Sequence, residues 1–357
     1  MDKPKLFTVG PTYVNEDVRE EMKRQMFSHR SSDYVKLHSE LIEKLREFLN
    51  TENEIFIYTS SSTGCMESGV RNMISDGGTG LSTICGAFGK RFGEIIEQNG
   101  RKLVESEVEW GEANRGEQLD EVLCKNPGVE VVTITHCETS TGLLNPLDEL
   151  CKVAKEHDVL TMVDTVSSMS GTRIEIDKLG IDFCFFGVQK CFSVPPGLAI
   201  AVVSKKAMEK AETVKNRGHY FDFLNLKKYN DKNMIPYTPP IPQMFGLSKQ
   251  LDMITDEGAG NRFYRHSKIS ARVRNGCKDL GFGVFPDEKY AAPTLSCISN
   301  PLEVDLAEMN SKMKERGFIL ASGYGKIKDM TFRIGNMGNV TLDDVNEMLE
   351  NLEEVVG

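Results

Sequence analysis

The stretches VLTMVD (159–164), IDFCFF (181–186) and LAIAVVS (198–204) follow one another along the chain and decide its fold class. None of them shows the regular alternation of apolar and polar residues that marks a strand with one face in water. Continuous apolar runs are instead typical of strands buried on both faces, as in parallel sheets. These stretches therefore predict an α/β layered domain, in which helices cover both faces of a largely parallel sheet.

The same pattern extends toward the N-terminus. EIFIY (54–58), LSTIC (81–85) and VEVVTITH (129–136) are expected to form further strands, each followed by an amphipathic helix. The inward positions of these helices are Met66, Val70 and Met73, then Phe92, Ile95 and Ile96, then Leu147, Leu150, Val153 and Ala154 after Pro146. Strands that alternate with helices in this way are typical of βαβ units.

The second half of the chain has a different rhythm. Residues 218–243 are rich in aromatic residues and prolines and are expected to form an ordered loop without a helix. A helical region is expected over about 243–280, followed by strand, helix, strand, strand and helix. We therefore predict a large domain (16–243) and a smaller α+β domain (244–357), with segment 1–15 packing on the smaller one.

Length and composition exclude several classes of protein. A chain of 357 residues favours two domains. The net charge of −10 argues against a nucleic-acid binder, and no apolar run approaches the roughly 20 residues that span a membrane. The N-terminus lacks an apolar signal core, and the nine cysteines form no CxxC pair. We expect reduced thiols, no metal site and a cytoplasmic location.

Two ionisable residues follow the buried strands. Asp164 ends one apolar run, and Lys190 in FFGVQKCFSVPPG comes just after the next. Either residue alone could be a helix cap or a lysine that reaches solvent, but ligands of open α/β sheets collect at the carboxyl ends of strands. A lysine in an apolar wall has a lowered pKa and forms imines, and a carboxylate keeps a pyridine ring protonated. The pair predicts a pyridoxal-phosphate (PLP) enzyme, with Lys190 as its Schiff base and Asp164 on the pyridine nitrogen.

A series of motifs strengthens this interpretation. YTSSSTGCME (58–67), CGAFGKR (85–91), THCETSTGLLNP (135–146), MVDTVSS (162–168), GVQKCFSVPPG (187–197) and FRIGNMG (332–338) resemble, in order, those of class V aminotransferases. The chain most resembles the alanine–glyoxylate / serine–pyruvate branch. The resemblance implies PLP-dependent transferase fold type I and a homodimer whose active sites are shared between subunits.

The resemblance also implies roles for individual residues around the cofactor. Ser61, Ser62 and Thr63 would bind its phosphate, as suits hydroxyl and N–H groups at the start of a helix. The other expected contacts are Phe88 stacked on the ring, Val166 on the opposite ring face, Thr139 at O3′, Gln189 at the phosphate or nearby, and Tyr237 and Thr238 at the partner subunit's phosphate.

Two arginines are candidates for substrate binding. Arg333 in TFRIG corresponds to the family's arginine for the substrate α-carboxylate, which a guanidinium can bind with two parallel hydrogen bonds. Arg30 lies in FSHRSSDY (27–34), which resembles the substrate-binding segment of phosphoserine aminotransferase. It would bind a phosphate or a side-chain carboxylate, or else form an ion pair with Asp33.

The predicted function is transfer of an amino group from a small L-amino acid (alanine, serine or aspartate) to a 2-oxo acid such as glyoxylate or pyruvate, by ping-pong chemistry through a Lys190 Schiff base. Phosphoserine aminotransferase is one alternative. A desulfurase or related lyase is another, although ASGYGKIKD (321–329) lacks the cysteine and Phe88 replaces the histidine of those enzymes. A dehydrogenase or a non-catalytic binding module is a third, but no GxGxxG follows the first strand and no P-loop is present.

Overall fold

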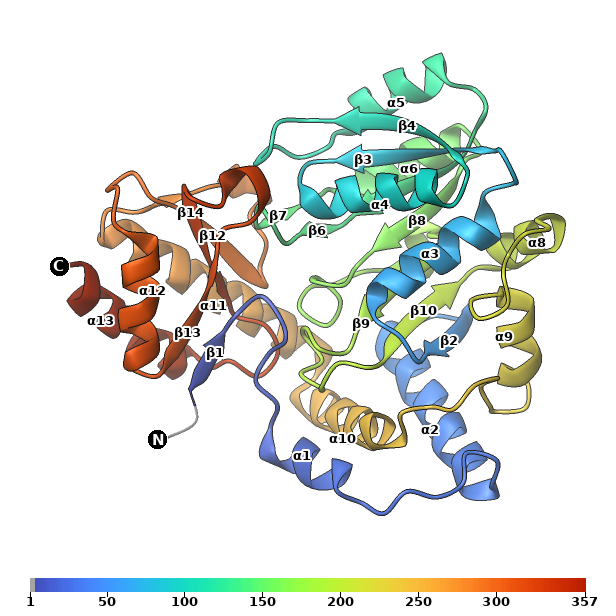
Figure 1. Ribbon diagram of the computed structural model, residues 1–357, viewed down its shortest axis with the longest axis horizontal. Coiled ribbons are helices and arrows are strands. Elements are labelled where there is room, and N and C mark those ends of the chain that lie inside the picture. The colour runs from blue at the N-terminus through green and yellow to red at the C-terminus, as the bar shows by residue number, and fades with distance from the viewer. Residues whose placement is uncertain (1–3) are drawn as a thin grey trace.

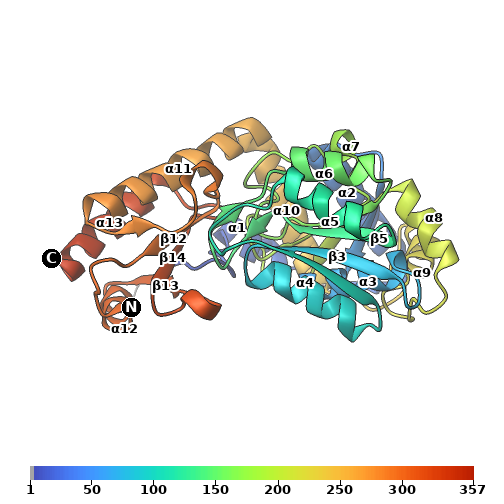
Figure 2. The ribbon, with the colours of Figure 1, turned by 90° about the horizontal axis from the view of Figure 1, so that it is seen from above.

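The computed structural model describes residues 4–357 and contains a large and a small sheet, well separated in Figures 1 and 2. The large sheet has seven strands, in the order β2 (Glu54–Tyr58), β10 (Ala199–Val203), β9 (Phe183–Gly187), β8 (Leu160–Asp164), β5 (Val129–Thr135), β3 (Thr79–Ile84) and β4 (Lys102–Glu107). β10 runs antiparallel to both of its neighbours, and the remaining pairs are parallel. The largely parallel sheet predicted from the apolar runs is therefore confirmed.

Helices cover both faces of the large sheet. One face carries α3 (Ser62–Met73), α4 (Ala87–Gln98), α8 (Lys205–Thr213) and α9 (Phe223–Asn230). The other carries α2 (Ser32–Leu49), α5 (Gly116–Lys125), α6 (Leu147–Glu156), α7 (Ile176–Leu179) and α10 (Ile241–Glu257), with α1 (Glu16–Met22) against α10. Successive strand residues point to opposite faces of the sheet. Phe183 and Phe185 therefore belong to the core under α3 and α4, whereas Cys184 and Phe186 belong to the core under α2 and α10.

The small sheet has five strands, in the order β1 (Lys5–Phe7), β13 (Phe318–Ser322), β14 (Thr331–Gly335), β12 (Leu295–Ser299) and β11 (Gly283–Val284). The helices α11 (Ala259–Asp279), α12 (Leu306–Glu315) and α13 (Leu342–Val356) share one apolar core with it. Short 3₁₀ turns lie at Glu288–Tyr290 and Gly325–Ile327, and β6 (Cys137–Glu138) pairs with β7 (Leu143–Leu144). The order of elements predicted for about 290–357 is confirmed.

The expectation that residues 218–243 contain no helix is wrong. α9 occupies Phe223–Asn230, ahead of the prolines, and the side chain of Asp222 caps it by accepting a hydrogen bond from the Leu224 N–H. Proline ends a helix only where it interrupts the interior; before or within the first turn it is well tolerated. Accordingly, α10 begins directly after Pro240 and carries Pro242 in its first turn.

The long helical region predicted after residue 243 consists of two helices. Gly258 separates α10 from α11 with φ of +79°, a conformation that glycine adopts readily. α10 packs against α1 and α2 and contributes Leu247 and Leu251 to the core of the large sheet. This packing favours a domain boundary near Gly258, and the limits 16–243 and 244–357 stay a prediction.

The N-terminal segment pairs with the small sheet and then returns to the large one. β1 lies parallel to β13, with Lys5 opposite Phe318. This pairing favours the expected packing of segment 1–15, of which residues 1–3 lie outside the described residues. Beyond β1, the Thr12 hydroxyl donates a hydrogen bond of 2.9 Å to the carbonyl oxygen of Lys190.

The structure contains no disulfide bond among its described residues. All nine cysteines are free thiols, of which Cys124 is exposed and the other eight are buried. Within residues 4–357, no helix combines the length and the apolar composition that crossing a membrane would require. The cytoplasmic location stays a prediction.

Candidate active site

A cavity opens at the carboxyl ends of the parallel strands of the large sheet. Asp164 is the last residue of β8, Lys190 follows β9, and Thr139 follows the short strand β6, just beyond the end of β5. The residues that line the cavity are Ser61, Ser62, Thr63, Met66, Phe88, Arg91, Thr139, Asp164, Val166, Gln189 and Lys190. The residues expected around a cofactor within one subunit are therefore brought together at the edge where open α/β sheets bind ligands.

Lys190 is enclosed by the N-terminal segment. Its ammonium group donates a hydrogen bond to the carbonyl oxygen of Val9, and a Cβ on Gly10 would lie 2.5 Å from the Lys190 Cδ. Gly10 has φ of +105°, so both backbone conformation and space require glycine there. Burial lowers the pKa of Lys190 to about 8. Its amine is consequently available in neutral, nucleophilic form near physiological pH.

Asp164 lines the cavity with 4% of its surface exposed. Its Oδ1 accepts a hydrogen bond of 2.8 Å from the Val166 N–H, and no lysine or arginine of the described residues pairs with it. Burial raises the pKa of Asp164 to about 7. A buried carboxylate without a basic partner is costly, and a positively charged ligand group would lower that cost.

The turn between β2 and α3 forms a corner of the cavity that is suited to an anion. Ser62 starts α3, where backbone N–H groups and the positive end of the helix point at a ligand. Its buried Oγ has no hydrogen-bond partner among the described residues. A Cβ on Gly187 would lie 2.5 Å from both this Oγ and the Gln189 Oε1, so the glycine keeps the corner open.

Glu138 positions the aromatic wall of the cavity. One of its carboxylate oxygens accepts hydrogen bonds from the N–H groups of Phe88 (3.0 Å) and Gly89 (3.1 Å), and the other accepts from Ser140. Glu138 is fully buried, and burial raises its pKa. The carboxylate thus fixes the first turn of α4 and the place of Phe88, where a negative charge also suits the helix dipole.

We expect Glu138→Gln to destabilise the large domain, because an amide nitrogen cannot accept the hydrogen bonds that one carboxylate oxygen accepts now. The free energy of unfolding should fall by about 1–3 kcal/mol, measured by urea denaturation followed by circular dichroism. Glu94→Gln, an exposed change on the same helix, should alter it by less than about 0.5 kcal/mol. Equal stability of the two variants would contradict this role for Glu138.

Arg333, on β14 of the small sheet, does not itself line the cavity but contacts Thr139, which does. Its Nη1 donates to the carbonyl oxygen of Thr139 at 3.0 Å, and its Nε donates to the carbonyl oxygen of Ser322 at 3.0 Å. The side chain is 7% exposed and has no acidic partner within ion-pair distance in residues 4–357. A buried guanidinium normally pairs with an anion, so Arg333 is suited to a carboxylate ligand.

The model of aminotransferase class-V proteins matches residues 13–327, most of the chain. This chain belongs to the class-V aminotransferase family. It is 35% identical to an uncharacterised aminotransferase of Methanocaldococcus jannaschii over 94% of this chain and 88% of that protein. An L-aspartate–glyoxylate aminotransferase of Paracoccus denitrificans is 31% identical over 94% of this chain and 87% of its own length.

A solved structure agrees with this assignment. The alanine–glyoxylate aminotransferase from Nostoc sp. superposes with a TM-score of 0.95 at 27% identity, covering 100% of this chain and 96% of that one. The aminotransferase described here therefore has PLP-dependent transferase fold type I, as the sequence motifs imply.

Several residues expected in the site of this aminotransferase do not line the cavity of the chain to which they belong. Tyr237 stacks on Tyr220 at 4.0 Å between ring centroids and donates a hydrogen bond to the carbonyl oxygen of His219, and Thr238 is exposed. Arg30 donates to the carbonyl oxygens of Ile235 (3.3 Å) and Pro236 (3.2 Å). Arg30 therefore holds the proline-rich loop, and the expected ion pair with Asp33 is absent from the described residues.

The sequence interpretation missed other residues of the aminotransferase site. Met66 and Arg91 line the cavity, one turn along α3 and α4 from residues that it did name. Tyr324, from the loop after β13, stacks on Phe88 with 6.0 Å between ring centroids. The helical spacing could have indicated Met66 and Arg91, but nothing local to Tyr324 marks it as part of the site.

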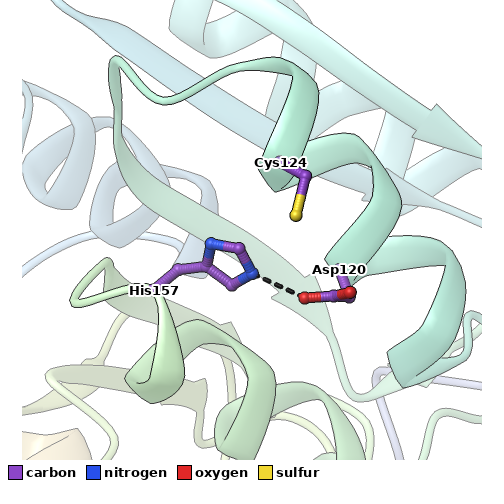
Figure 3. Close-up of side chains that lie close together, drawn as sticks. All are labelled: Asp120, Cys124 and His157. Carbon is purple, nitrogen blue, oxygen red and sulfur yellow. Dashed lines mark hydrogen bonds and ion pairs between the residues drawn. The ribbon is translucent and has the colours of Figure 1, made fainter.

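A separate group of possible metal ligands lies on α5 and after α6 (Figure 3). The ligand atoms of Asp120, Cys124 and His157 all lie within 4.8 Å of one another. A hydrogen bond of 2.6 Å between His157 Nε2 and Asp120 Oδ1, and the packing of α5 on α6, account for this proximity without a metal. None of the three lines the aminotransferase cavity.

Proposed function

We propose that this aminotransferase transfers the amino group of a small L-amino acid (alanine, serine or aspartate) to a 2-oxo acid such as glyoxylate or pyruvate in a PLP-dependent, ping-pong reaction. The observation that carries the proposal is that Lys190 and Asp164 line the same cavity. The names of the relatives support it, since alanine–glyoxylate and L-aspartate–glyoxylate enzymes share the acceptor glyoxylate.

The residues of the cavity fit PLP. The unpartnered Oγ of Ser62 lies at the N-terminus of α3, which suits the phosphate. Asp164 has no basic partner among the described residues and suits the pyridine nitrogen. Phe88 and Val166 are available for the two faces of the ring, and Thr139 and Gln189 supply polar groups at its edge. When bound, PLP supplies an electron sink for the charge that develops at the substrate Cα.

The protein's own residues would bind, orient and move protons. The Lys190 amine, with its lowered pKa, would hold the cofactor covalently and later carry the proton between positions on the reacting substrate. Arg333 would orient the substrate through its α-carboxylate, because a guanidinium fixes a carboxylate in one plane. The cavity wall formed by α4 and the N-terminal segment would restrict access of water.

We also propose that the enzyme is a homodimer with shared active sites. Tyr237 and Thr238 do not line the cavity of their own chain. In class-V aminotransferases, the corresponding loop contacts the cofactor phosphate in the partner subunit. Arg30 would then support the loop through the carbonyl oxygens of Ile235 and Pro236. Phosphoserine aminotransferase is the alternative function that depends on Arg30 as a phosphate-binding residue. In its own chain, the Arg30 guanidinium faces these carbonyl oxygens.

A panel of amino donors and acceptors tests the proposed function. Alanine, serine, aspartate and phosphoserine are each incubated with glyoxylate, pyruvate or 2-oxoglutarate, and amino-acid products are quantified by chromatography. We expect formation of glycine from glyoxylate, and parallel reciprocal plots when donor and acceptor concentrations are varied, as ping-pong kinetics require. Absence of transfer with every pair, or activity confined to phosphoserine, would contradict the proposal.

A further inference from the structure

Arg91 is shared between the active-site cavity and a neighbouring hollow. It lines this cavity together with Lys190 and Asp164, and it also lines an outer hollow together with Tyr324 and Trp110. The side chain comes from the second turn of α4, close to Phe88: its Cζ lies 4.7 Å from the centroid of the Phe88 ring. Arg91 is therefore placed beside both the cavity and the outer hollow.

Arg91 forms no ion pair within the described residues, although its charge acts on Asp164, which lines the same cavity: burial raises the pKa of that carboxyl, and Arg91 acts to lower it. Among residues 4–357, no carboxylate lies within ion-pair distance of its guanidinium, whereas Arg101 and Arg115, also on the large domain, pair with Asp76 and Glu149. Within the described residues, its guanidinium donates a hydrogen bond of 3.3 Å to the Tyr324 hydroxyl. Since a guanidinium carries five N–H donors, most of them remain available to a ligand.

Tyr324 joins Arg91 to the other arginine of the site. Its ring lies nearly parallel to that of Phe88, at an interplanar angle of 22°, and the Cζ of Arg333 lies 5.5 Å from its centroid. One aromatic side chain thus contacts both guanidinium groups, Arg333 through the ring and Arg91 through the hydroxyl. Neither arginine has an acidic partner in the described chain, so the site presents two separate receptors for anions.

We propose that Arg91, positioned by Tyr324, binds the second carboxylate of a dicarboxylic substrate such as aspartate, while Arg333 binds the α-carboxylate. This inference rests on the proposed function and names the donor class within it. The acidic residues of the outer hollow, Glu94 and Glu107, are exposed. Neither carboxylate lies within ion-pair distance of Arg91.

The first experiment measures binding without turnover. Succinate and butyrate have the same chain length and differ in one carboxylate, so isothermal titration of the holoenzyme with each isolates the second anionic contact. We expect succinate to bind at least tenfold more tightly than butyrate. Arg91→Gln should reduce this preference by roughly 10- to 150-fold, the range of a charge-assisted bidentate contact. Tyr324→Phe should reduce it less, because it removes only the hydroxyl that orients Arg91.

The second experiment measures specificity. In Arg91→Gln, the ratio of kcat/KM for aspartate to kcat/KM for alanine should fall by at least tenfold. Lys90→Gln is the matched control, because it removes a positive charge from the adjacent position of α4, which lines the outer hollow but not the cavity. It should change the succinate preference and the specificity ratio by less than about twofold. Far-UV circular dichroism and cofactor absorbance check that each variant is folded and loaded.

The possible failures are distinguishable. A wild-type enzyme that transaminates alanine or serine but binds succinate no more tightly than butyrate would overturn the inference and leave the proposed function standing. Equal losses for succinate and butyrate in Arg91→Gln would assign Arg91 a general structural role and also overturn it. A wild-type protein that prefers succinate through Arg91 yet shows no transamination would support the anion site and contradict the proposed function.

Discussion

Lys190→Ala should abolish transamination while the protein keeps its fold and still binds PLP noncovalently. The variant lacks both the amine that holds the cofactor and the group that moves the proton, and proton transfer alone is worth about 10²- to 10⁴-fold. We expect kcat to fall by at least 10³-fold. Borohydride reduction followed by peptide mass spectrometry should show a cofactor adduct on Lys190 in the wild type and none in the variant.

The pH dependence of cofactor attachment provides a second measurement. The lowered pKa of Lys190, about 8, means that the neutral amine becomes more abundant as pH rises through this value. In stopped-flow absorbance, attachment to the cofactor-free protein should therefore accelerate with pH and level off above about 8. Lys205→Ala, an exposed change outside the site, should behave as wild type. Retention of normal kcat in Lys190→Ala would refute the assignment.

Asp164→Asn should lower kcat by about 10²-fold or more and change KM much less. Asparagine preserves an oxygen for the Val166 N–H but cannot keep the pyridine nitrogen protonated, so stabilisation of the transition state is lost more than substrate binding. Steady-state kinetics on a productive donor measures both constants. A decrease in kcat of less than threefold would mean that Asp164 is not the partner of the pyridine nitrogen.

Stability separates this catalytic effect from misfolding. The ordinary pKa of an aspartate is near 4, and burial raises that of Asp164 to about 7. The folded, cofactor-free protein therefore holds a proton that the unfolded chain has released between these values, and it loses stability as pH rises from about 4 to 7. Asparagine has no such dependence, so cofactor-free Asp164→Asn should be at least as stable as wild type at pH 8 in thermal denaturation.

The fold and the centre of the site follow from local features of the sequence. Apolar runs such as FCFFG can be buried on both faces only inside a layered sheet, and this places their carboxyl ends at one edge. Asp164 and Lys190 therefore had to lie near each other once the strands were parallel. The sequence accordingly predicts the layer arrangement, the small α+β unit and the grouping of the residues expected around the cofactor.

The residues that escaped prediction depend on contacts between distant segments. Tyr324 meets Phe88 only because the small sheet packs beside the large one, a relation that no local pattern encodes. The substrate-binding role expected for Arg30 stays a prediction; within its own chain the guanidinium contacts the backbone of the proline-rich loop. α9 differs from the expectation because the prolines lie further along the chain, and the Asp222 cap starts a helix ahead of them.

The distribution of thiols makes this protein suitable for single-site spectroscopic labelling. Since Cys124 on α5 is exposed and the other cysteines are buried, a maleimide dye should attach to the native protein at one position, which does not line the cavity. Unfolding would open the remaining thiols to the reagent. The number of dye molecules bound per chain therefore reports the native fraction of any active-site variant, independently of its cofactor and its catalysis.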